Sequence, residues 1–326
     1  MRAAQTDLFP AVASDAHPVA LRALAAGAVL SASVSGGKDS QAMLARLMDL
    51  RRAHGWNGSV EAIHADLGRA EWPQTPGHVE ASVAREGVPL VVVQRDKGDL
   101  VQRIEERLNT VSTLDPTRPA KPFWPSAAQR YCTSDLKRGP IRKHVRRHGP
   151  HALVVSAQGM RAAESHNRAK TPVLSLERGI TGKAYLDAHA EGATLADLLD
   201  WHLTDPAGRL VLRWLPIHDW DDDEVWAQLG TDPADLDRRR ALHASGAEAD
   251  ALVGWLAHPA YVLGNTRLSC SLCVLASRAD LLNGIKHNRP LAEHYAALEE
   301  RTGYTFTETV SIADLITEAD RLASTT

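Results

Sequence analysis

A glycine-rich segment near the N-terminus has the residue types of a phosphate-binding loop. It reads Ser33-Val34-Ser35-Gly36-Gly37-Lys38-Asp39-Ser40. Paired glycines let the backbone approach an anion closely, and the free amides that begin a following helix point toward it. The spacing matches neither a Walker A loop nor G-x-G-x-x-G. We therefore predict a nucleotide phosphate site of another type, built from Ser33, Ser35, Gly36, Gly37, Lys38, Asp39 and Ser40. The alternative is a plain strand-to-helix turn of small residues.

Arginines and a carboxylate form a second candidate group. The segment runs from Gly159 through Arg161 and Glu164 to Arg168. Guanidinium groups bind phosphate or sulfate bidentately and stay charged. Glu164 could orient Arg161 or help to hold Mg²⁺ on the phosphates of ATP. The alternative is a solvated helix start with i,i+3 and i,i+4 ion pairs. Asp66, at the end of an expected strand, is a further candidate for binding the nucleotide.

The chain has three cysteines, Cys132, Cys270 and Cys273. A small, odd number argues against a disulfide framework. The Cys-x-x-Cys spacing of the later pair suits ligation of a metal or cluster, and also redox chemistry. Four readings stay open: an iron–sulfur cluster, a zinc site completed by His258 or His287, thiol chemistry, and three buried structural residues.

A basic segment follows Cys132. It contains Lys137, Arg138, Arg142, Lys143, Arg146 and Arg147. On a helix, Arg138, Arg142 and Arg146 would share one face. Such a face can neutralise several phosphates of a nucleic acid or guide a nucleotide into a cleft. The alternative is an ordinary solvated helix face.

Strand-like and helix-like segments alternate and must position these groups. Apolar runs at 28–34, 60–67, 89–94, 152–157 and 210–217 are predicted strands, with helices between them. This alternation predicts an α/β fold with a doubly wound parallel sheet, whose ligands bind at the carboxyl ends of the strands. We expect a long ordered loop at 109–130 and an insertion with a short helix at about 181–205. Residues 1–220 are the predicted nucleotide-binding domain, and 221–326 a helical C-terminal unit that carries the Cys-x-x-Cys.

The charge and hydropathy of the chain limit the kinds of partner that it can bind. The formal net charge is −3, so contact with a nucleic acid needs a local basic patch. No apolar run is long enough to span a bilayer, and no secretory signal is evident at the N-terminus. We therefore expect a cytoplasmic protein with no membrane partner. An oligomer is possible.

The motifs together resemble a known superfamily. Ser35–Ser40, placed after the first strand, resembles the PP-loop of the N-type ATP pyrophosphatases, which have an adenine nucleotide alpha hydrolase-like fold. His64–Gly68, Gly159–Arg168 and Leu215–Trp226 resemble elements of the phosphoadenylyl-sulfate reductase branch, with Glu224 in place of its usual Asp. In joining such a domain to clustered cysteines, the chain most resembles the sulfurtransferase of DNA phosphorothioation. The resemblance covers roughly residues 28 to 275.

The resemblance implies the chemistry of the site. It implies that the loop holds ATP, that Lys38, Asp39, Arg161 and Glu164 take part in catalysis, and that Asp66, Gly159 and Arg168 bind nucleotide. Adenylyl-sulfate reductases bind a 4Fe-4S cluster through a Cys-Cys pair and a later Cys-x-x-Cys. Here Tyr131 replaces the first cysteine, so a cluster on Cys132, Cys270 and Cys273 would leave one iron free for an outside ligand. No cysteine follows Cys273, so reduction through a C-terminal thiol is not expected.

The expected function is ATP-dependent adenylation of an acceptor with pyrophosphate release. It is coupled to sulfur transfer through the cysteine-bound cluster. Mg²⁺ assists, the acceptor is a nucleic acid, and a sulfur donor such as a cysteine desulfurase supplies the sulfur. The alternatives are a sulfonucleotide reductase-like enzyme that acts on a small molecule, and a non-catalytic nucleotide-binding subunit of a DNA modification or defence complex.

Overall fold

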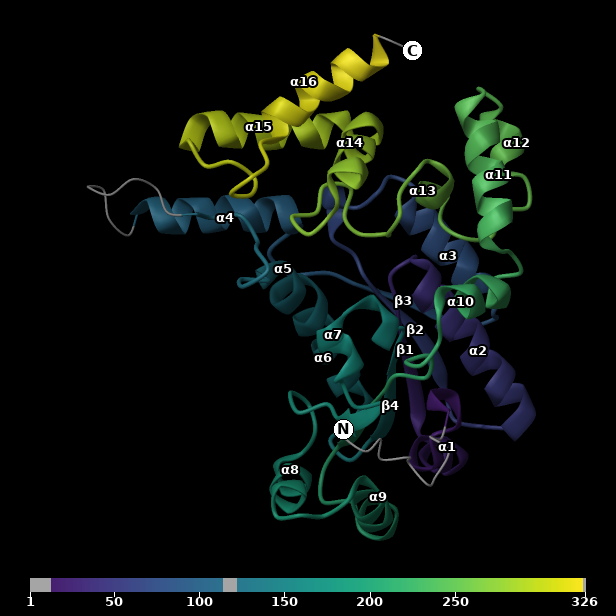
Figure 1. The fold of residues 1–326 in the computed structure, drawn as a ribbon. Coiled ribbons are helices and arrows are strands. Elements are labelled where there is room, and N and C mark those ends of the chain that lie inside the picture. The colour runs from purple at the N-terminus through teal and green to yellow at the C-terminus, as the bar shows by residue number, and fades with distance from the viewer. Residues whose placement is uncertain (1–12, 114–121, 325–326) are drawn as a thin grey trace, which may run out of the picture.

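The computed structural model describes residues 13–113 and 122–324. Its centre is a six-stranded sheet with the order β3-β2-β1-β4-β6-β5 (Figure 1). The strands are β1 (Val29–Val34), β2 (Val60–Ala65), β3 (Leu90–Val93), β4 (Leu153–Gln158), β5 (Leu174–Leu176) and β6 (Leu210–Trp214). All neighbouring pairs are parallel except β5 and β6, which are antiparallel. The predicted α/β fold with a largely parallel sheet is confirmed.

Helices cover both faces of this sheet, as the apolar strands require. Every residue of β2 is buried, which is typical of a parallel strand with covered faces. One face packs on α1 (Pro18–Ala25), α2 (Lys38–His54) and α3 (Thr75–Arg85). On the other face Ile63 and Val154 pack with Val145 of α6 (Gly139–Val145). Since β1, β2, β3, β4 and β6 run parallel, their carboxyl ends share one edge of the sheet.

Three connections differ from expectation. The insertion holds two helices, α8 (Lys183–Ala190) and α9 (Leu195–Thr204), each of which buries apolar side chains against the main core. β5 was not predicted because three residues carry too little periodicity to reveal a strand. The first part of the loop expected at 109–130 is the end of α4 (Leu100–Thr113), and residues 114–121 of it lie outside the described residues.

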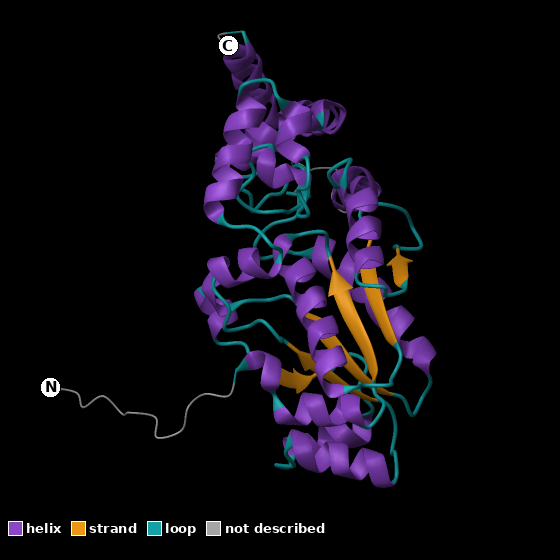
Figure 2. Cartoon of the chain, turned by 90° about the vertical axis from the view of Figure 1, so that its right-hand side faces the viewer, coloured by secondary structure: helices purple, strands orange, loops and turns teal. Residues whose placement is uncertain are grey.

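The C-terminal unit is helical, as expected. It contains α10 (Asp222–Gln228), α11 (Pro233–Ala244), α12 (Glu248–Leu252), α13 (Pro259–Val262), α14 (Arg278–His287), α15 (Arg289–Thr302) and α16 (Ile312–Ala323). Helices α10 to α13 share the core of the sheet, whereas α14 to α16 form a second core with α4. The domain boundary at residue 220 stays a prediction, because α10 to α13 follow this residue and yet pack in the core of the sheet. In Figure 2 the C-terminal helices lie beyond the arrowheads of the parallel strands.

No helix in residues 13–113 and 122–324 is long and apolar enough to cross a bilayer.

Candidate nucleotide and thiol site

A cavity of about 530 Å³ opens at the carboxyl edge of the sheet. The glycine-rich loop between β1 and α2 forms one wall, and residues that follow β2 and β4 form two others. The segment Thr266–Cys270, which follows α13, closes the cavity from the C-terminal unit. This volume lies within the range of about 300–1,000 Å³ that is usual for small-molecule sites.

The loop is shaped by internal contacts that leave several amides open. Gly36 has φ 78°, a left-handed conformation that favours glycine. Ser40 accepts from the amide of Ser35 at 3.1 Å and donates to the carbonyl of Gly37 at 2.9 Å. The amide of Lys38 donates to the hydroxyl of Tyr261 at 3.1 Å. The amides of Gly36, Gly37, Asp39 and Ser40 have no recorded partner among the described residues. They are therefore available to an anion at the helix start.

Gly159 sits directly against this helix start. A Cβ at Gly159 would lie 2.7 Å from the carbonyl oxygen of Asp39 and 2.9 Å from the amide nitrogen of Ser40. Such contacts are too close for any side chain, so the end of β4 can approach the loop only as glycine. Gly159 therefore shapes the loop through packing, and its role in nucleotide binding stays a prediction.

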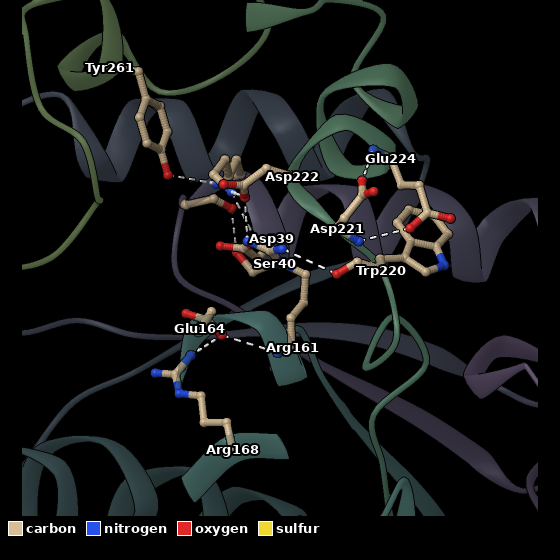
Figure 3. A network of polar contacts seen from close by, with 12 residues as sticks. Asp39, Ser40, Arg161, Glu164, Arg168, Trp220, Asp221, Asp222, Glu224 and Tyr261 are labelled. Carbon is tan, nitrogen blue, oxygen red and sulfur yellow. Dashed lines mark hydrogen bonds and ion pairs between the residues drawn. The ribbon is translucent and has the colours of Figure 1, made fainter. Parts of the chain in front are cut away.

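Four side chains form an ion network beside the loop (Figure 3). Arg161, which is 3% exposed, donates from Nε to Asp39 Oδ1 at 2.5 Å and from Nη2 to Asp222 Oδ1 at 2.6 Å. Lys38 Nζ lies 2.5 Å from the same Asp222 oxygen and 3.4 Å from Asp39 Oδ1. Burial lowers the pKa of Arg161, but Asp39 and Asp222 outweigh that effect and raise it. Arg161 therefore stays charged inside the site.

Both carboxylates of this network use only one oxygen. Every recorded contact of Asp39 and Asp222 with Lys38 and Arg161 goes to Oδ1. Within the described chain the second oxygen of each carboxylate has no recorded hydrogen bond. Carboxylate oxygens of this kind, together with substrate phosphates, are the ligands that Mg²⁺ prefers. The residues present therefore fit a Mg²⁺ ion delivered with a nucleotide.

Glu164 and Arg168 line the same cavity but pair with each other. Glu164 accepts from the backbone amide of Arg161 at 3.1 Å and forms an ion pair with Arg168. Glu164 thus fixes the backbone of Arg161, while Asp39 and Asp222 orient its guanidinium. The i,i+4 ion pair that the alternative interpretation expected at a helix start is therefore present between Glu164 and Arg168.

Asp66 does not line the cavity, and its nucleotide-binding role stays a prediction. Its carboxylate accepts from the amide of Gly68 at 2.7 Å and contacts Gln94, and both contacts shape the turn after β2. His64 and Glu71 line the cavity instead, with Nε2 of His64 3.3 Å from Glu71. Burial lowers the pKa of His64, but the contacts with Glu71 outweigh it and raise the pKa.

The three cysteines lie near one another. Cys132 and Cys270 pack against the same apolar cluster, and Cys270 also lines the cavity of the loop. Burial raises the pKa of the Cys270 thiol to about 12, with Lys137 opposing the shift and Cys273, Glu71 and Cys132 adding to it. The structure therefore brings the three cysteines together at the edge of the predicted phosphate site, although Cys132 and Cys270 are 138 positions apart in the sequence (270 − 132).

The thiol positions bear on the choice between zinc and a cluster. Tetrahedral zinc with Zn–S bonds of about 2.3 Å needs sulfurs about 3.8 Å apart. Within the described residues the three sulfurs do not form a group whose ligand atoms all lie within 4.8 Å, with or without a histidine. His258 is bonded to Thr75 and to the amide of Ala260. The described residues therefore form no preformed zinc site at the thiols, and a cluster on the three cysteines stays a prediction.

The basic segment does not form one continuous helix face. Ser134–Arg138 is a π turn, Gly139–Val145 is α6, and Arg146–His148 is a 3₁₀ turn. Arg142 pairs with Glu177, Lys143 with Asp96, and Arg146 donates to the carbonyl of Gly179. Arg147 is exposed. Lys137 and Arg138 instead line the cavity. The segment therefore contributes charge to the nucleotide site more directly than to an outer surface.

Several lining residues were missed from the sequence. Asp221 caps α10 by accepting from the amide of Glu224, while Asp222 contacts Lys38 in the site. Three consecutive acids directly after a strand-end motif were the available signal. Tyr261 and Arg267 had no signal, because only the fold of the C-terminal unit brings them to the loop.

Comparisons with known proteins give one family model and two solved structures that are similar to the chain. A family model described as "Phosphoadenosine phosphosulfate reductase domain" matches residues 29–235. A search of curated proteins gave no match. Phosphoadenylyl-sulfate reductase from Candida auris, in a phosphate complex, is similar with 13% identity and a TM-score of 0.35, over 62% of this chain and 71% of that chain. The U34-tRNA thiolase NcsA from Methanococcus maripaludis, with its [4Fe-4S] cluster, is similar with 13% identity and a TM-score of 0.39, over 94% of this chain and 78% of that chain.

Proposed function

Because the chain belongs to the phosphoadenosine phosphosulfate reductase domain family, whose model matches well over half of its length, we propose that it is an enzyme that adenylates an acceptor. ATP binds on Ser35–Ser40, pyrophosphate is released, and sulfur then replaces AMP on the acceptor. The observation that carries this proposal is a cavity in which the open amides of the loop, Arg161 and Cys270 meet.

The charges of the cavity favour a polyphosphate. Six cationic and four acidic side chains line it, which leaves a surplus of two positive charges (6 − 4). Asp39, Asp222 and Glu164 are already paired with cations. Lys137, Arg138 and Arg267 line the cavity with no ion pair recorded among the described residues. A polyphosphate would therefore supply the missing negative charge.

The residues of the loop act by position and charge. The amides at the start of α2 hold the phosphates, and Lys38 and Arg161 neutralise charge that develops on the leaving pyrophosphate. In the present structure both cations contact Asp222, whose side chain is 65% exposed. An arriving phosphate can take the place of Asp222, and the freed carboxylate is then available to Mg²⁺, which neutralises the phosphates when it is bound.

The thiols supply the second half of the proposal. Cys132, Cys270 and Cys273 would hold an iron–sulfur cluster, which when bound offers an iron without a protein ligand for exogenous sulfur. The acceptor is a nucleic acid that meets the site beside Lys137 and Arg138. A cysteine desulfurase is the proposed class of sulfur donor. The same cavity could also take a sulfonucleotide, because its phosphate-binding groups do not distinguish a sulfonucleotide from ATP.

Pyrophosphate release tests the proposal. Full-length protein is incubated with ATP, Mg²⁺ and single-stranded DNA or RNA. Lys38→Ala should reduce release by at least about 100-fold, as expected for loss of a charge-stabilising group. Lys183→Ala is the matched control, because Lys183 lies on α8 and, among the described residues, pairs with Asp187 at the surface. Equal release from wild type and Lys38→Ala would refute the mechanism. Tight binding of adenylyl sulfate without binding of nucleic acid would favour the small-molecule alternative.

A further inference from the structure

We propose that Glu61, His144 and His148 form a second site, which binds a divalent transition-metal ion such as Zn²⁺ and joins β2 to the basic segment. Nε2 of His144 lies 2.9 Å from one carboxylate oxygen of Glu61, and Nε2 of His148 lies 2.8 Å from the other. The ligand atoms of all three residues lie within 4.8 Å of one another. None of the three residues lines the nucleotide cavity.

Two elements create this arrangement. Side chains alternate along a strand, so Glu61 and Ile63 of β2 point to the same face, toward Val145 of α6. His144 and His148 are four residues apart on consecutive helical turns, so both rings project from one side. The rings are 5.6 Å apart and perpendicular, and each directs Nε2 to Glu61.

The donor set suits a borderline metal ion. Two imidazole nitrogens and one carboxylate oxygen bind zinc and its neighbours at about 2.0–2.2 Å, with water in a remaining position. The present spacing of 2.8 and 2.9 Å between donor atoms needs only a slight opening to seat such an ion. Glu61 is 9% exposed, while the side chain of His148 is 22% exposed. The site is therefore enclosed by protein and still reachable by an ion through His148.

The protonation states also permit binding. Burial raises the pKa of Glu61, but hydrogen bonds from His144 and His148 outweigh it and hold the pKa below its ordinary value. The carboxylate is thus ionised and ready to ligate. Nδ1 of His144 is buried with no hydrogen-bond partner among the described residues. Moving the imidazole proton to Nδ1 frees Nε2 for a metal, at the cost of the hydrogen bond to Glu61 and of a buried N–H that has no acceptor among the described residues.

Metal binding here would have a defined structural consequence. His144 lies on α6, directly after the turn that carries Lys137 and Arg138 into the nucleotide cavity. β2 ends at Ala65, which also lines the cavity. An ion held between the two elements would fix the basic segment against the sheet and so stabilise that wall of the nucleotide site.

Titration with Co²⁺ can separate this site from the thiols. Chelator-treated full-length protein is titrated with Co²⁺, and absorbance is followed. Cysteine ligation gives thiolate-to-metal charge-transfer bands, whereas a His₂Glu site gives visible bands without them. His148→Ala and Glu61→Gln each remove one donor, and circular dichroism checks that each variant folds. His151→Ala is the matched control, since His151 is exposed and its Nδ1 bonds the carbonyl of Pro206.

The expected result is one bound Co²⁺ without a thiolate band, displaced by Zn²⁺. Its affinity should fall at least about 10- to 100-fold in His148→Ala and Glu61→Gln, because loss of even a partner of a ligand costs that much. Any separate thiolate band, from Co²⁺ on the cysteines, should be equal in wild type, His148→Ala and Glu61→Gln, and His151→Ala should titrate as wild type does. Wild-type protein that binds Co²⁺ only through thiolates, or equal binding by wild type and both variants, would overturn the proposal.

Discussion

The guanidinium Nε of Arg161 lies 2.5 Å from Oδ1 of Asp39, although 122 residues separate them in the chain. Arg161 follows β4 and Asp39 begins α2 after β1, and these strands are adjacent in the sheet. The contact therefore exists because two carboxyl ends of parallel strands meet at one edge. Asp222, which follows β6, completes the group from the next strand.

Arg161→Lys should lose most pyrophosphate release. Arg161 donates to Asp39, to Asp222 and to the carbonyl of Trp220 from three different nitrogens, which one ammonium cannot reproduce. We expect a loss of about 100-fold in the rate of release. Arg46→Lys is the matched control, because Arg46 lies on α2 and pairs with Asp15 outside the cavity. Similar losses in both variants would indicate a general effect on folding instead.

Gly159→Ala should abolish ATP binding while the protein still folds. The added methyl group would meet the backbone of Asp39 and Ser40, so the start of α2 must move. Gly77→Ala adds the same methyl group with no atom within 4 Å and should bind ATP normally. Calorimetric titration with ATP measures both. Normal affinity in Gly159→Ala would mean that the close approach of β4 to the loop is unimportant for binding.

Acid should destabilise the protein through His258. Burial, with His78 adding to it, lowers the pKa of His258 from 6.5 to about 3. Between these values the unfolded chain binds a proton that the folded chain does not, so stability falls as pH falls below about 6.5. At pH 5 this loss is about 2 kcal/mol relative to neutral pH.

Urea unfolding at pH 7 and pH 5 measures the effect. His258→Gln removes the titrating group and should show a smaller loss between the two pH values than wild type. His78, whose pKa burial and Arg85 lower to about 4, should contribute in the same direction. An identical pH dependence in wild type and His258→Gln would show that His258 is not held neutral.

ATP should protect Cys270 from alkylation. The Cys270 thiol lines the same cavity as the loop, and its raised pKa of about 12 leaves little thiolate at neutral pH. Metal-free protein should therefore react slowly with iodoacetamide at Cys270, faster as pH rises, and more slowly still with saturating ATP. Peptide mass spectrometry locates the label. An alkylation rate of Cys270 that is the same with and without ATP would show that the thiol does not lie in the nucleotide site.

Local patterns in the sequence predicted the sheet and the loop because both depend on neighbouring residues. The alternation of apolar runs with helices predicted the parallel sheet, and two glycines before Lys38 predicted the turn with open amides. Arg161 was found because its motif follows a strand. The nucleotide-binding role of Asp66 stays a prediction, and its carboxylate bonds Gly68 and Gln94 in the turn. Periodicity cannot show which way a side chain turns after its strand has ended.

The contributions of the C-terminal unit could not be predicted. Tyr261 reaches the amide of Lys38 across 223 residues, and this contact depends on how α13 packs on the sheet. The pairing of Glu61 with His144 and His148 likewise requires that α6 cross β2 at one register. Helical spacing predicted that the basic segment presents its arginines on one helix face. Ser134–Arg138 forms a π turn instead, and Lys137 and Arg138 line the cavity.

The central claim is that open amides at the start of α2, together with Lys38 and Arg161, hold a polyphosphate. A crystal structure with a non-hydrolysable ATP analogue and Mg²⁺ tests it most directly. The account predicts phosphate oxygens within hydrogen-bond distance of the amides of Gly36, Gly37, Asp39 or Ser40, with Asp222 released from Lys38. A saturated crystal whose phosphates lie elsewhere, with the contacts of Asp222 intact, would contradict it.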